Sequence, residues 1–472
     1  MTPFREGRSE HGERAGSDAA RPAPGSDSPV YRLLRRIIDV RPPEVPILGW
    51  SWVYIFAVLS AYYVIRPIRD EMGVASGVET LPWLFTGTLL GMLLVNAPFA
   101  ALVAKLPRVR FISFTYRFFM LNLLAFCVLL AVSIPAENVW IGRLFFIWTS
   151  VFNLFVVSVF WAMMVDVFDA EQGKRLFGVI AAGATLGSIL GSSVTALLAR
   201  RVGPVYLLVG SAMLLEVAVF CVRRLSHLSE AVRRRPTVRA EEAPIGGGIV
   251  SGLMHAFRSP YLLNICVYML LYAVTSTFLY FGQAGIVARS FADRATRTAF
   301  FARVDLAVNV LTLGAQLFLT DRLLRGLGVA VTLTLLPALS MLGFLALGLK
   351  PTIAIIVLFQ VLRRTGNFAV ARPTREVLFT VVSREDKYKA KSLIDTMVYR
   401  TGDQMGAWSF ALLSGVGLHI TGIALVAVPL SIAWLLNGFW LGREQEARTA
   451  GQAAASRGDA RQSVPAEQPA GS

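Results

Sequence analysis

Charged side chains crowd into one otherwise apolar stretch near the end of this 472-residue chain, between residues 359 and 403. A charge at the middle of a membrane helix costs roughly 2.5–3.5 kcal/mol on insertion scales, so several on one helix indicate a polar cavity rather than a lipid-facing surface. Arginine binds phosphate and carboxylate groups through its planar fork, and carboxylates pair with arginines or carry protons. The residues concerned are Arg363, Arg364, Arg372, Arg375, Glu376, Asp395, Arg400 and Asp403.

The composition is typical of a multi-pass membrane protein. The chain is 55% hydrophobic and only 16% charged, whereas soluble domains carry about 25% charged residues. Its formal net charge of +16 suits basic loops that meet anionic lipid, and no aromatic-basic module for nucleic acid accompanies it. The three cysteines and four histidines show no metal-ligand spacing, and no catalytic motif is present. We therefore expect no metal, no cofactor and no enzyme activity.

Apolar runs of about 20 residues, the length that a bilayer requires, predict an all-α fold with twelve transmembrane helices. Basic residues are concentrated in the loops on one side, which predicts that both termini and the central linker are cytoplasmic. The predicted spans are 49–70, 80–104, 110–134, 139–166, 175–199, 204–222, 261–288, 299–320, 328–349, 352–380, 391–418 and 420–441. We expect a disordered tail (1–29), an interfacial amphipathic helix (30–46), a six-helix half (47–222), a cytoplasmic linker (223–248), a second six-helix half (249–441) and a disordered tail (442–472).

The two sets of six helices are related by an internal repeat. An offset of about 215 residues places Gly187 and Gly191 on Gly402 and Gly406. Two parallel six-helix halves joined by a cytoplasmic linker describe the major facilitator architecture, whose site lies between the halves near the membrane midplane. The four-residue spacing of Gly183, Gly187 and Gly191 also predicts close contact with a neighbouring helix.

Four predicted helices carry a polar face, because residues three, four or seven apart share one side of a helix. Gly366 and Pro373 are expected to loosen the tenth helix, as is typical where backbone lines a cavity. The faces are Tyr62, Arg66, Arg69 and Gly73 on the first helix, Asp305, Asn309, Thr312 and Gln316 on the eighth, Gln360, Arg364, Asn367, Ala371 and Arg375 on the tenth, and Lys391, Asp395, Tyr399 and Gly402 on the eleventh.

Two interpretations of these charges compete. In one they are salt bridges that lock helices together, such as Arg375 with Asp395 or Arg303 with Asp305. In the other, arginines without partners await an anion, because an unpaired cation in a low-dielectric cavity is costly. The count favours the second, since ten intramembrane arginines face six acids. We predict that an organic anion, phosphorylated or not, binds Arg66, Arg69, Arg364, Asn367, Arg375 and Tyr399, and that charge pairing or proton coupling involves Asp70, Asp305, Glu376, Asp395, Arg400 and Asp403.

The chain resembles the ATP/ADP translocase (nucleotide transporter) family of bacteria and plastids, which is related to the major facilitator superfamily. The run 62-YYVIRPIRD-70 is similar to the family's Leu-Arg-x-x-Lys-Asp signature, with matches at Arg66, Arg69 and Asp70. Residues 160–187 are similar to a stretch of the family that is centred on Glu-Ala-Lys-Arg-Phe, with matches at Glu171, Lys174 and Arg175. The runs 371–382 and 386–403 are similar to the corresponding runs of uncharacterised bacterial relatives of the family. This resemblance implies twelve helices and nucleotide exchange across the cytoplasmic membrane.

The chain also departs from that family. Arg69 stands where the characterised translocases typically have Lys, and the chain has forty Arg to six Lys, a bias that suggests a GC-rich genome and a free-living owner with little use for imported ATP. The substrate is therefore either a nucleotide or another organic anion. Transport is coupled either to exchange of a second solute or to movement of protons. A non-transporting scaffold and a membrane-embedded enzyme are less favoured alternatives. We expect a monomer in the bacterial cytoplasmic membrane whose partners are a small anion and lipid, not nucleic acid.

Overall fold

The computed structural model describes residues 39–133, 135–232, 259–382, 391 and 394–462. Helices form almost all of this part, and no strand occurs within it. The predicted first tail and most of the interfacial helix (30–46) lie outside the described residues, as does most of the linker.

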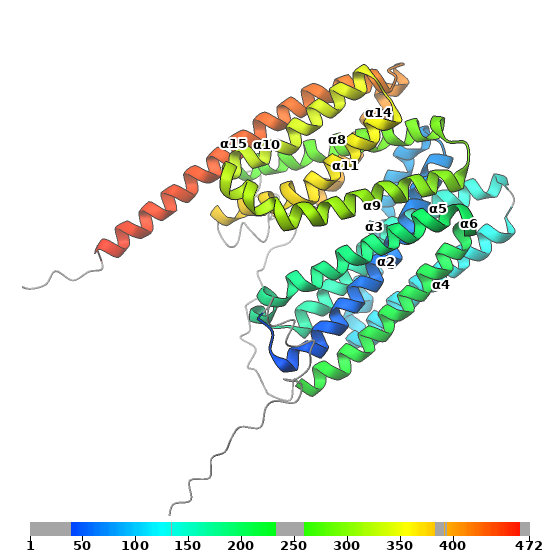
Figure 1. Cartoon of the computed structure of the whole chain (residues 1–472), viewed down its shortest axis with the longest axis horizontal. Helices are drawn as coiled ribbons and strands as arrows, with labels where there is room; N and C mark the ends of the chain where they lie inside the picture. Colours follow the sequence, from blue (N-terminus) through cyan, green and yellow to red (C-terminus); the bar gives the residue numbers. More distant parts are fainter. Residues whose placement is uncertain (1–38, 134, 233–258, 383–390, 392–393, 463–472) are drawn as a thin grey trace, which may run out of the picture.

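The helices form two groups in chain order (Figure 1). The first group contains η1 (Pro42–Glu44), α2 (Val45–Ala75), η2 (Val78–Thr80), α3 (Leu81–Lys105), α4 (Arg108–Val132), α5 (Pro135–Val167) and α6 (Ala170–Val232). The second group contains α8 (Pro260–Ser290), α9 (Arg294–Phe318), α10 (Thr320–Leu349), α11 (Ile353–Gly366), η3 (Asn367–Ala371), α12 (Arg372–Leu378), η4 (Phe379–Val381), η5 (Ile394–Val398), α14 (Tyr399–Gly415) and α15 (Ile420–Gln462).

Ten helices of the described chain are long and apolar enough to cross a membrane, whereas the sequence predicts twelve spans. Two features account for the difference. α6 contains the fifth and sixth predicted spans, joined at Gly203, whose φ of 74° interrupts the helical conformation. The eleventh predicted span is divided between the π-helical turn η5 and α14, which has only 17 residues. Each predicted span thus corresponds to helical residues in the structure. The observed helix ends do not divide these residues into twelve separate helices, because two spans are merged in α6 and one is divided.

Glycine contacts show the internal repeat in three dimensions. A Cβ on Gly187 would lie 2.4 Å from the carbonyl oxygen of Phe56, so α6 packs backbone to backbone against α2. In the second half, a Cβ on Gly402 would lie 2.6 Å from the Cβ of Ala273, where α14 packs against α8. The predicted close approach is therefore present, at equivalent places in both halves, because only glycine leaves room for the neighbouring backbone.

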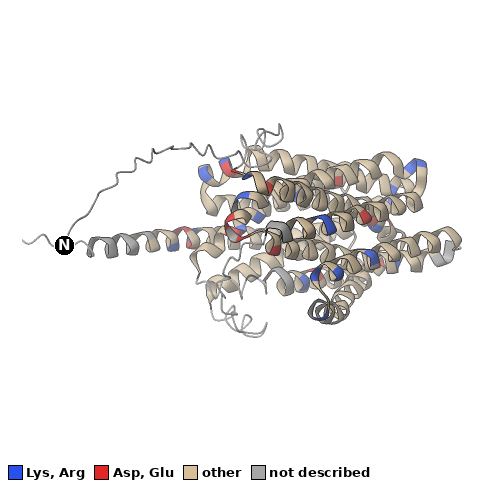
Figure 2. Cartoon of the chain, turned by 90° about the horizontal axis from the view of Figure 1, so that it is seen from below, with Lys and Arg blue, Asp and Glu red and all other residues tan. Residues whose placement is uncertain are grey.

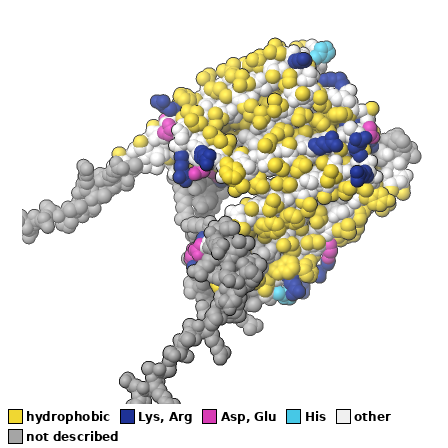
Figure 3. All heavy atoms as spheres, viewed as in Figure 1, with side chains coloured by type: hydrophobic (Ala, Val, Ile, Leu, Met, Phe, Trp, Pro, Cys, Tyr) yellow, Lys and Arg dark blue, Asp and Glu magenta, His cyan; other side chains and the backbone are white. Residues whose placement is uncertain are grey.

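Successive spans run in opposite directions, so the chain enters and leaves each half at the same end of the bundle. α2 begins, α6 ends and α8 begins at what we call the linker end, from which α15 projects (Figure 1). On the face shown in Figure 3, hydrophobic side chains cover the middle and most Lys and Arg side chains lie toward the ends. Figure 2 shows charged residues along the length of the bundle as well.

Two helices extend beyond their predicted ends. α6 continues through the first part of the predicted linker to Val232, and α15 continues to Gln462 where a disordered tail was expected from residue 442. Residues 442–462 of α15 are rich in Ala, Arg, Gln and Glu, which favour helix. Tertiary contacts add to this preference, since Glu446 accepts a hydrogen bond from the Ala330 amide at 3.1 Å and Arg448 stacks on Tyr261 at 4.5 Å.

Candidate functional site

One carboxylate and two arginines join the two halves in the middle of the bundle. Asp305 Oδ1, on α9, lies 2.6 Å from Arg364 Nη1 on α11 and 3.3 Å from Arg66 Nη1 on α2. The Asp305 side chain is 2% exposed, against 15% for Arg364 and 20% for Arg66. Asp305 Oδ2 and Arg364 Nη2 have no hydrogen-bond partner among the described residues. This charged layer therefore carries one positive charge in excess and has polar groups free for a ligand.

A cavity of about 420 Å³ lies one helical turn from the charged layer, on its linker side. Asn309 follows Asp305 by one turn, Tyr63 precedes Arg66 by one turn, and Phe368 follows Arg364 by one turn. The volume falls in the range of roughly 300–1,000 Å³ that is typical of small-molecule sites. The lining residues come from both halves: Tyr63, Ala184, Thr185, Ser188, Asn309, Thr312, Gln316, Phe368, Arg372, Pro373 and Glu376.

The eighth predicted span contributes as its spacing predicts. Asn309, Thr312 and Gln316 lie along one wall of the cavity, in line with Asp305 of the charged layer. Arg303, by contrast, is exposed. The salt bridge between Arg303 and Asp305, an example given for the helix-locking interpretation, is not formed, because Asp305 pairs with Arg66 and Arg364 instead.

The tenth predicted span is not a continuous α-helix. η3 is a π-helical turn, which takes up one more residue than an α-helical turn. Pro373 has no amide to bond the Ala369 carbonyl, which accepts a hydrogen bond from Thr320 Oγ1 at 2.7 Å instead. The cavity is consequently lined one residue later than an uninterrupted helix predicts, by Arg372 and Glu376 rather than by positions 371 and 375.

Two predicted binding residues on this span therefore lie elsewhere. Arg375 turns toward α8, where its Nη1 lies 2.7 Å from Met269 Sδ. Asn367 is buried within the π-helical turn itself. The sequence signal for the change of register was the pair Gly366 and Pro373, but the size of the shift requires the structure.

Arg363 and Arg364 are adjacent but serve different places. Arg363 is 3% exposed and points into the second half, away from the cavity. Its guanidinium donates hydrogen bonds to Ser340 Oγ at 2.9 Å, Ser276 Oγ at 2.7 Å and Thr275 Oγ1 at 2.8 Å, as well as to the Tyr272 carbonyl at 3.2 Å. This buried cation is solvated by neutral hydroxyls and joins α8, α10 and α11, which makes its role structural.

A second charged cluster lies across the bundle from the cavity. Asp70 Oδ1 lies 2.8 Å from Arg69 Nη1 and accepts a hydrogen bond from the Tyr280 hydroxyl at 3.0 Å, which links the halves. Arg400 Nη1 lies 3.2 Å from Asp403 Oδ2. A polar pocket of about 40 Å³ separates these pairs, and it is lined by Arg69, Phe85, Thr88, Leu89, Ser150, Arg400, Asp403 and Gln404. Arg66 and Arg69, predicted to act together, thus belong to different sites.

Of three other predicted site residues, one lies at the mouth of the cavity, one lies away from its lining and one has a side chain outside the described part of the chain. Glu376, at the linker end of the cavity, pairs with Lys391. Tyr399 packs against Tyr272, with ring centroids 6.1 Å apart. The side chain of Asp395 lies outside the described part of the chain, so the structure does not test its pair with Arg375, the other example given for the helix-locking interpretation.

The end of the bundle opposite the linker is closed by contacts between the halves that the sequence did not indicate. Glu71, 3% exposed, pairs with Arg294 at 3.0 Å and with Arg297 at 4.0 Å. Thr86 on α3 donates a hydrogen bond to Gln404 on α14 at 3.0 Å. At the linker end, in contrast, Arg372 and Glu376 of the cavity wall are exposed. In the part of the chain that the structure describes, the bundle is therefore closed at the end opposite the linker, and the cavity wall is exposed toward the linker end.

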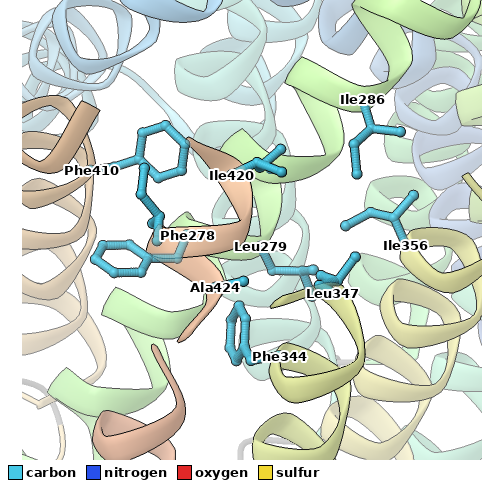
Figure 4. Close-up of a pocket in the computed structure, with 11 residues that line it drawn as sticks. Phe278, Leu279, Ile286, Phe344, Leu347, Ile356, Phe410, Ile420 and Ala424 are labelled. Atoms are coloured by element: carbon cyan, nitrogen blue, oxygen red, sulfur yellow. The ribbon is translucent and has the colours of Figure 1, made fainter. Parts of the chain in front are cut away.

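A third hollow has no chemistry to offer an anion. It lies inside the second half, and its lining side chains, among them Phe278, Phe344 and Ile356, are all apolar (Figure 4). Its volume of about 10 Å³ is at the lower limit for one water molecule. We interpret this hollow as a packing gap between α8, α10, α11, α14 and α15.

Comparison with known proteins defines the class first. The structure superimposes on the POT family transporter PepTSo with a TM-score of 0.59 at 12% identity, covering 86% of this chain and 98% of that one. The nucleoside transporter NupG gives a TM-score of 0.56 at 13% identity, covering 85% and 98%. The inward-open xylose transporter XylE from E. coli also gives 0.56, at 11% identity, covering 83% and 95%. The chain therefore has the fold of these transporters, the major facilitator fold that its internal repeat predicts.

The sequence comparison is more specific. ADP,ATP carrier protein 2 of Chlamydia pneumoniae is 20% identical over 82% of this chain and 87% of its own length. ADP,ATP carrier protein 2 of Chlamydia trachomatis is 21% identical over 66% of each chain. No family model matches the sequence. The resemblance to ATP/ADP translocases that the motifs indicate is thus confirmed at the level of distant similarity.

Proposed function

We propose that this protein is a secondary transporter that moves a small organic anion across the membrane by alternating access between its two halves. The charged layer carries the proposal, because one buried carboxylate faces two arginines at the inner end of a cavity. An anion entering from the cavity would neutralise the excess charge and compete with Asp305 for the arginines. Contacts of that kind across both halves would couple binding to movement.

In this proposal Arg66, Arg364 and Arg372 hold the anionic group, since arginine's fork suits phosphate and carboxylate. Tyr63 and Phe368 offer apolar ring surface for the organic part of the substrate. A nucleotide is the first candidate, because the distant relatives are ADP,ATP carriers. We also propose that the linker end and both termini face the cytoplasm, as the distribution of basic residues predicts. The conformation described above is then the inward-open one.

Uptake into proteoliposomes tests the proposal. The full chain is reconstituted, and uptake of labelled ATP, ADP and a panel of organic anions is measured with and without unlabelled anion inside. Arg364→Ala and Arg372→Ala should each lower uptake by tenfold or more, because a lost charge-assisted hydrogen bond costs about 1.5–3 kcal/mol. Arg303→Gln, a cation on α9 outside the lining, is the matched control and should retain uptake within about twofold of wild type.

Arg375→Ala separates the structural assignment from the sequence prediction. If the π-helical turn sets the register, Arg372→Ala lowers uptake far more than Arg375→Ala. Equal losses, or a larger loss for Arg375→Ala, would contradict the binding set proposed here. Transport of neutral or cationic solutes alone would refute an anion carrier.

A further inference from the structure

The polar pocket beside Asp403 has no role in the anion site just proposed. Its lining residues come from α2, α3 and α5 of the first half and from α14 of the second. Its volume of about 40 Å³ and its charged and hydroxyl lining suit a few water molecules rather than an organic solute. The seam that encloses it is held by the hydrogen bond from Thr86 to Gln404, next to Asp403 in sequence. Any separation of the halves at this seam opens the pocket.

Asp403 is a buried carboxylate with weak compensation. It is 7% exposed, and among the described residues it forms an ion pair with Arg400 alone, at 3.2 Å; the Arg400 side chain is 35% exposed. Arg69 also faces it from α2, but that guanidinium lies closer to Asp70, at 2.8 Å. Its other neighbours among the described residues include the neutral hydroxyl groups of Thr277 and Tyr399. An ionised carboxylate in such a place is costly, and a proton from a water molecule in the pocket removes the cost.

The charges around the two sites give protonation a consequence for the substrate. The buried Arg363, beside Arg364, is a further cation nearby but belongs to neither site. The two sites together contain four arginines (Arg66, Arg69, Arg364 and Arg400) and three acids (Asp70, Asp305 and Asp403), a net charge of +1. One proton on Asp403 raises this to +2 and releases Arg400 from its partner. Binding of an anion then becomes more favourable, and by linkage a bound anion makes protonation more favourable to the same extent.

We propose that Asp403 is a proton-binding site, and that a proton taken up there travels with the anion in the same direction. The proton moves from water to a carboxylate oxygen, and no other bond is made or broken. When the halves rock, the seam between α3 and α14 opens and exposes Asp403 to the opposite side, where the proton leaves with the anion. This inference rests on the proposed anion transport and specifies its coupling.

Proteoliposomes with the membrane potential held at zero test the coupling, with labelled ATP as the probe. Counterflow against internal unlabelled ATP at one pH measures transport without a proton gradient. An inside-alkaline gradient of one pH unit should then drive accumulation of up to about tenfold for one proton per anion. In wild type, binding of ATP in weakly buffered solution should take up about one proton per protein. These two wild-type measurements do not depend on any variant folding correctly.

Variants assign the proton to its site. Asp403→Asn should abolish gradient-driven accumulation, whereas Asp403→Glu should retain it. The control is Glu216→Gln, which should also retain accumulation, because Glu216 is a half-exposed acid paired with Arg117 on the outer side of the first half. Counterflow without gradient-driven accumulation in wild type overturns the proton site while leaving anion transport standing. Retained accumulation in Asp403→Asn overturns the assignment to Asp403. Absence of counterflow for ATP and for every anion of the panel overturns the proposed function, and this inference with it.

Discussion

Replacing Asp305 with Asn tests the charge balance on which the anion site depends. Asp305 lies 2.6 Å from Arg364 and 3.3 Å from Arg66. At an effective dielectric constant of about 20, each attraction amounts to roughly 5–6 kcal/mol, and desolvation of the three side chains offsets most of it. Removal of the acid alone leaves two partly buried cations facing each other. We therefore expect Asp305→Asn to lower the free energy of unfolding by about 3–5 kcal/mol.

The assay is denaturant-induced unfolding of the purified full chain in mild detergent. Adding Arg66→Gln to Asp305→Asn should recover part of the loss, because it removes a cation that no longer has a partner, whereas Arg66→Gln alone should destabilise. Asp321→Asn is the matched control: its pair with Arg325 is 70–81% exposed, so its loss should stay within about 0.5 kcal/mol.

Two results would refute the reasoning about Asp305. One is a loss for Asp305→Asn as small as that of the exposed control. The other is full additivity of Asp305→Asn and Arg66→Gln, since residues in one charge network must show an interaction energy in a double-mutant cycle. Either result would mean that the layer between the halves is not held by charge.

Three further predictions concern packing, a buried cation and a helix cap. Gly187→Ala should destabilise by about 1–3 kcal/mol or more, because its Cβ would meet the Phe56 carbonyl oxygen at 2.4 Å, whereas Gly178→Ala, with nothing within 4 Å, should be neutral or stabilising in the same unfolding assay. Arg363→Lys should lower stability without changing the uptake preference between anions, since an ammonium cannot make all four hydrogen bonds of the buried guanidinium. Asp293 lies between the spans at the start of α9, and hydrogen bonds from Thr296 lower the pKa of its carboxyl group. Asp293→Ala should therefore lower the free energy of unfolding by about 0.5–2 kcal/mol at neutral pH. This loss should fade as the pH falls below about 4, where the carboxylate becomes protonated, and thermal unfolding at both pH values measures it.

The sequence by itself determined the fold class and the repeat. Apolar runs of membrane length leave helices as the one way to satisfy the backbone in lipid, and a constant offset between halves leaves few architectures. The close helix contacts at Gly187 and Gly402 could also be predicted, because a four-residue glycine spacing in membrane helices typically allows a neighbouring helix to approach closely. Arg66, Asp305 and Arg364 were all named from composition and spacing, though not as one group.

Only the tertiary structure decided which charges face the same space. Arg363 and Arg364 differ by about 100° around the helix axis, so one enters the second half and the other meets Asp305. The π-helical turn at 367–371 moves the lining by one residue, from positions 371 and 375 to Arg372 and Glu376, a shift that a constant helical period cannot express. The closure by Glu71 and Arg294 joins residues 223 positions apart.

The opening stretch of charges thus divides into different roles. Helical spacing fixes which residues share a side of one helix, but not which neighbour that side meets, because packing between helices depends on the whole bundle. Arg364 and Arg372 face the space between the halves, Arg363 supports the second half from within, and Asp403 lies in a separate pocket at the seam. Sequence chemistry supplied the charges, and tertiary packing decided which of them a substrate can reach.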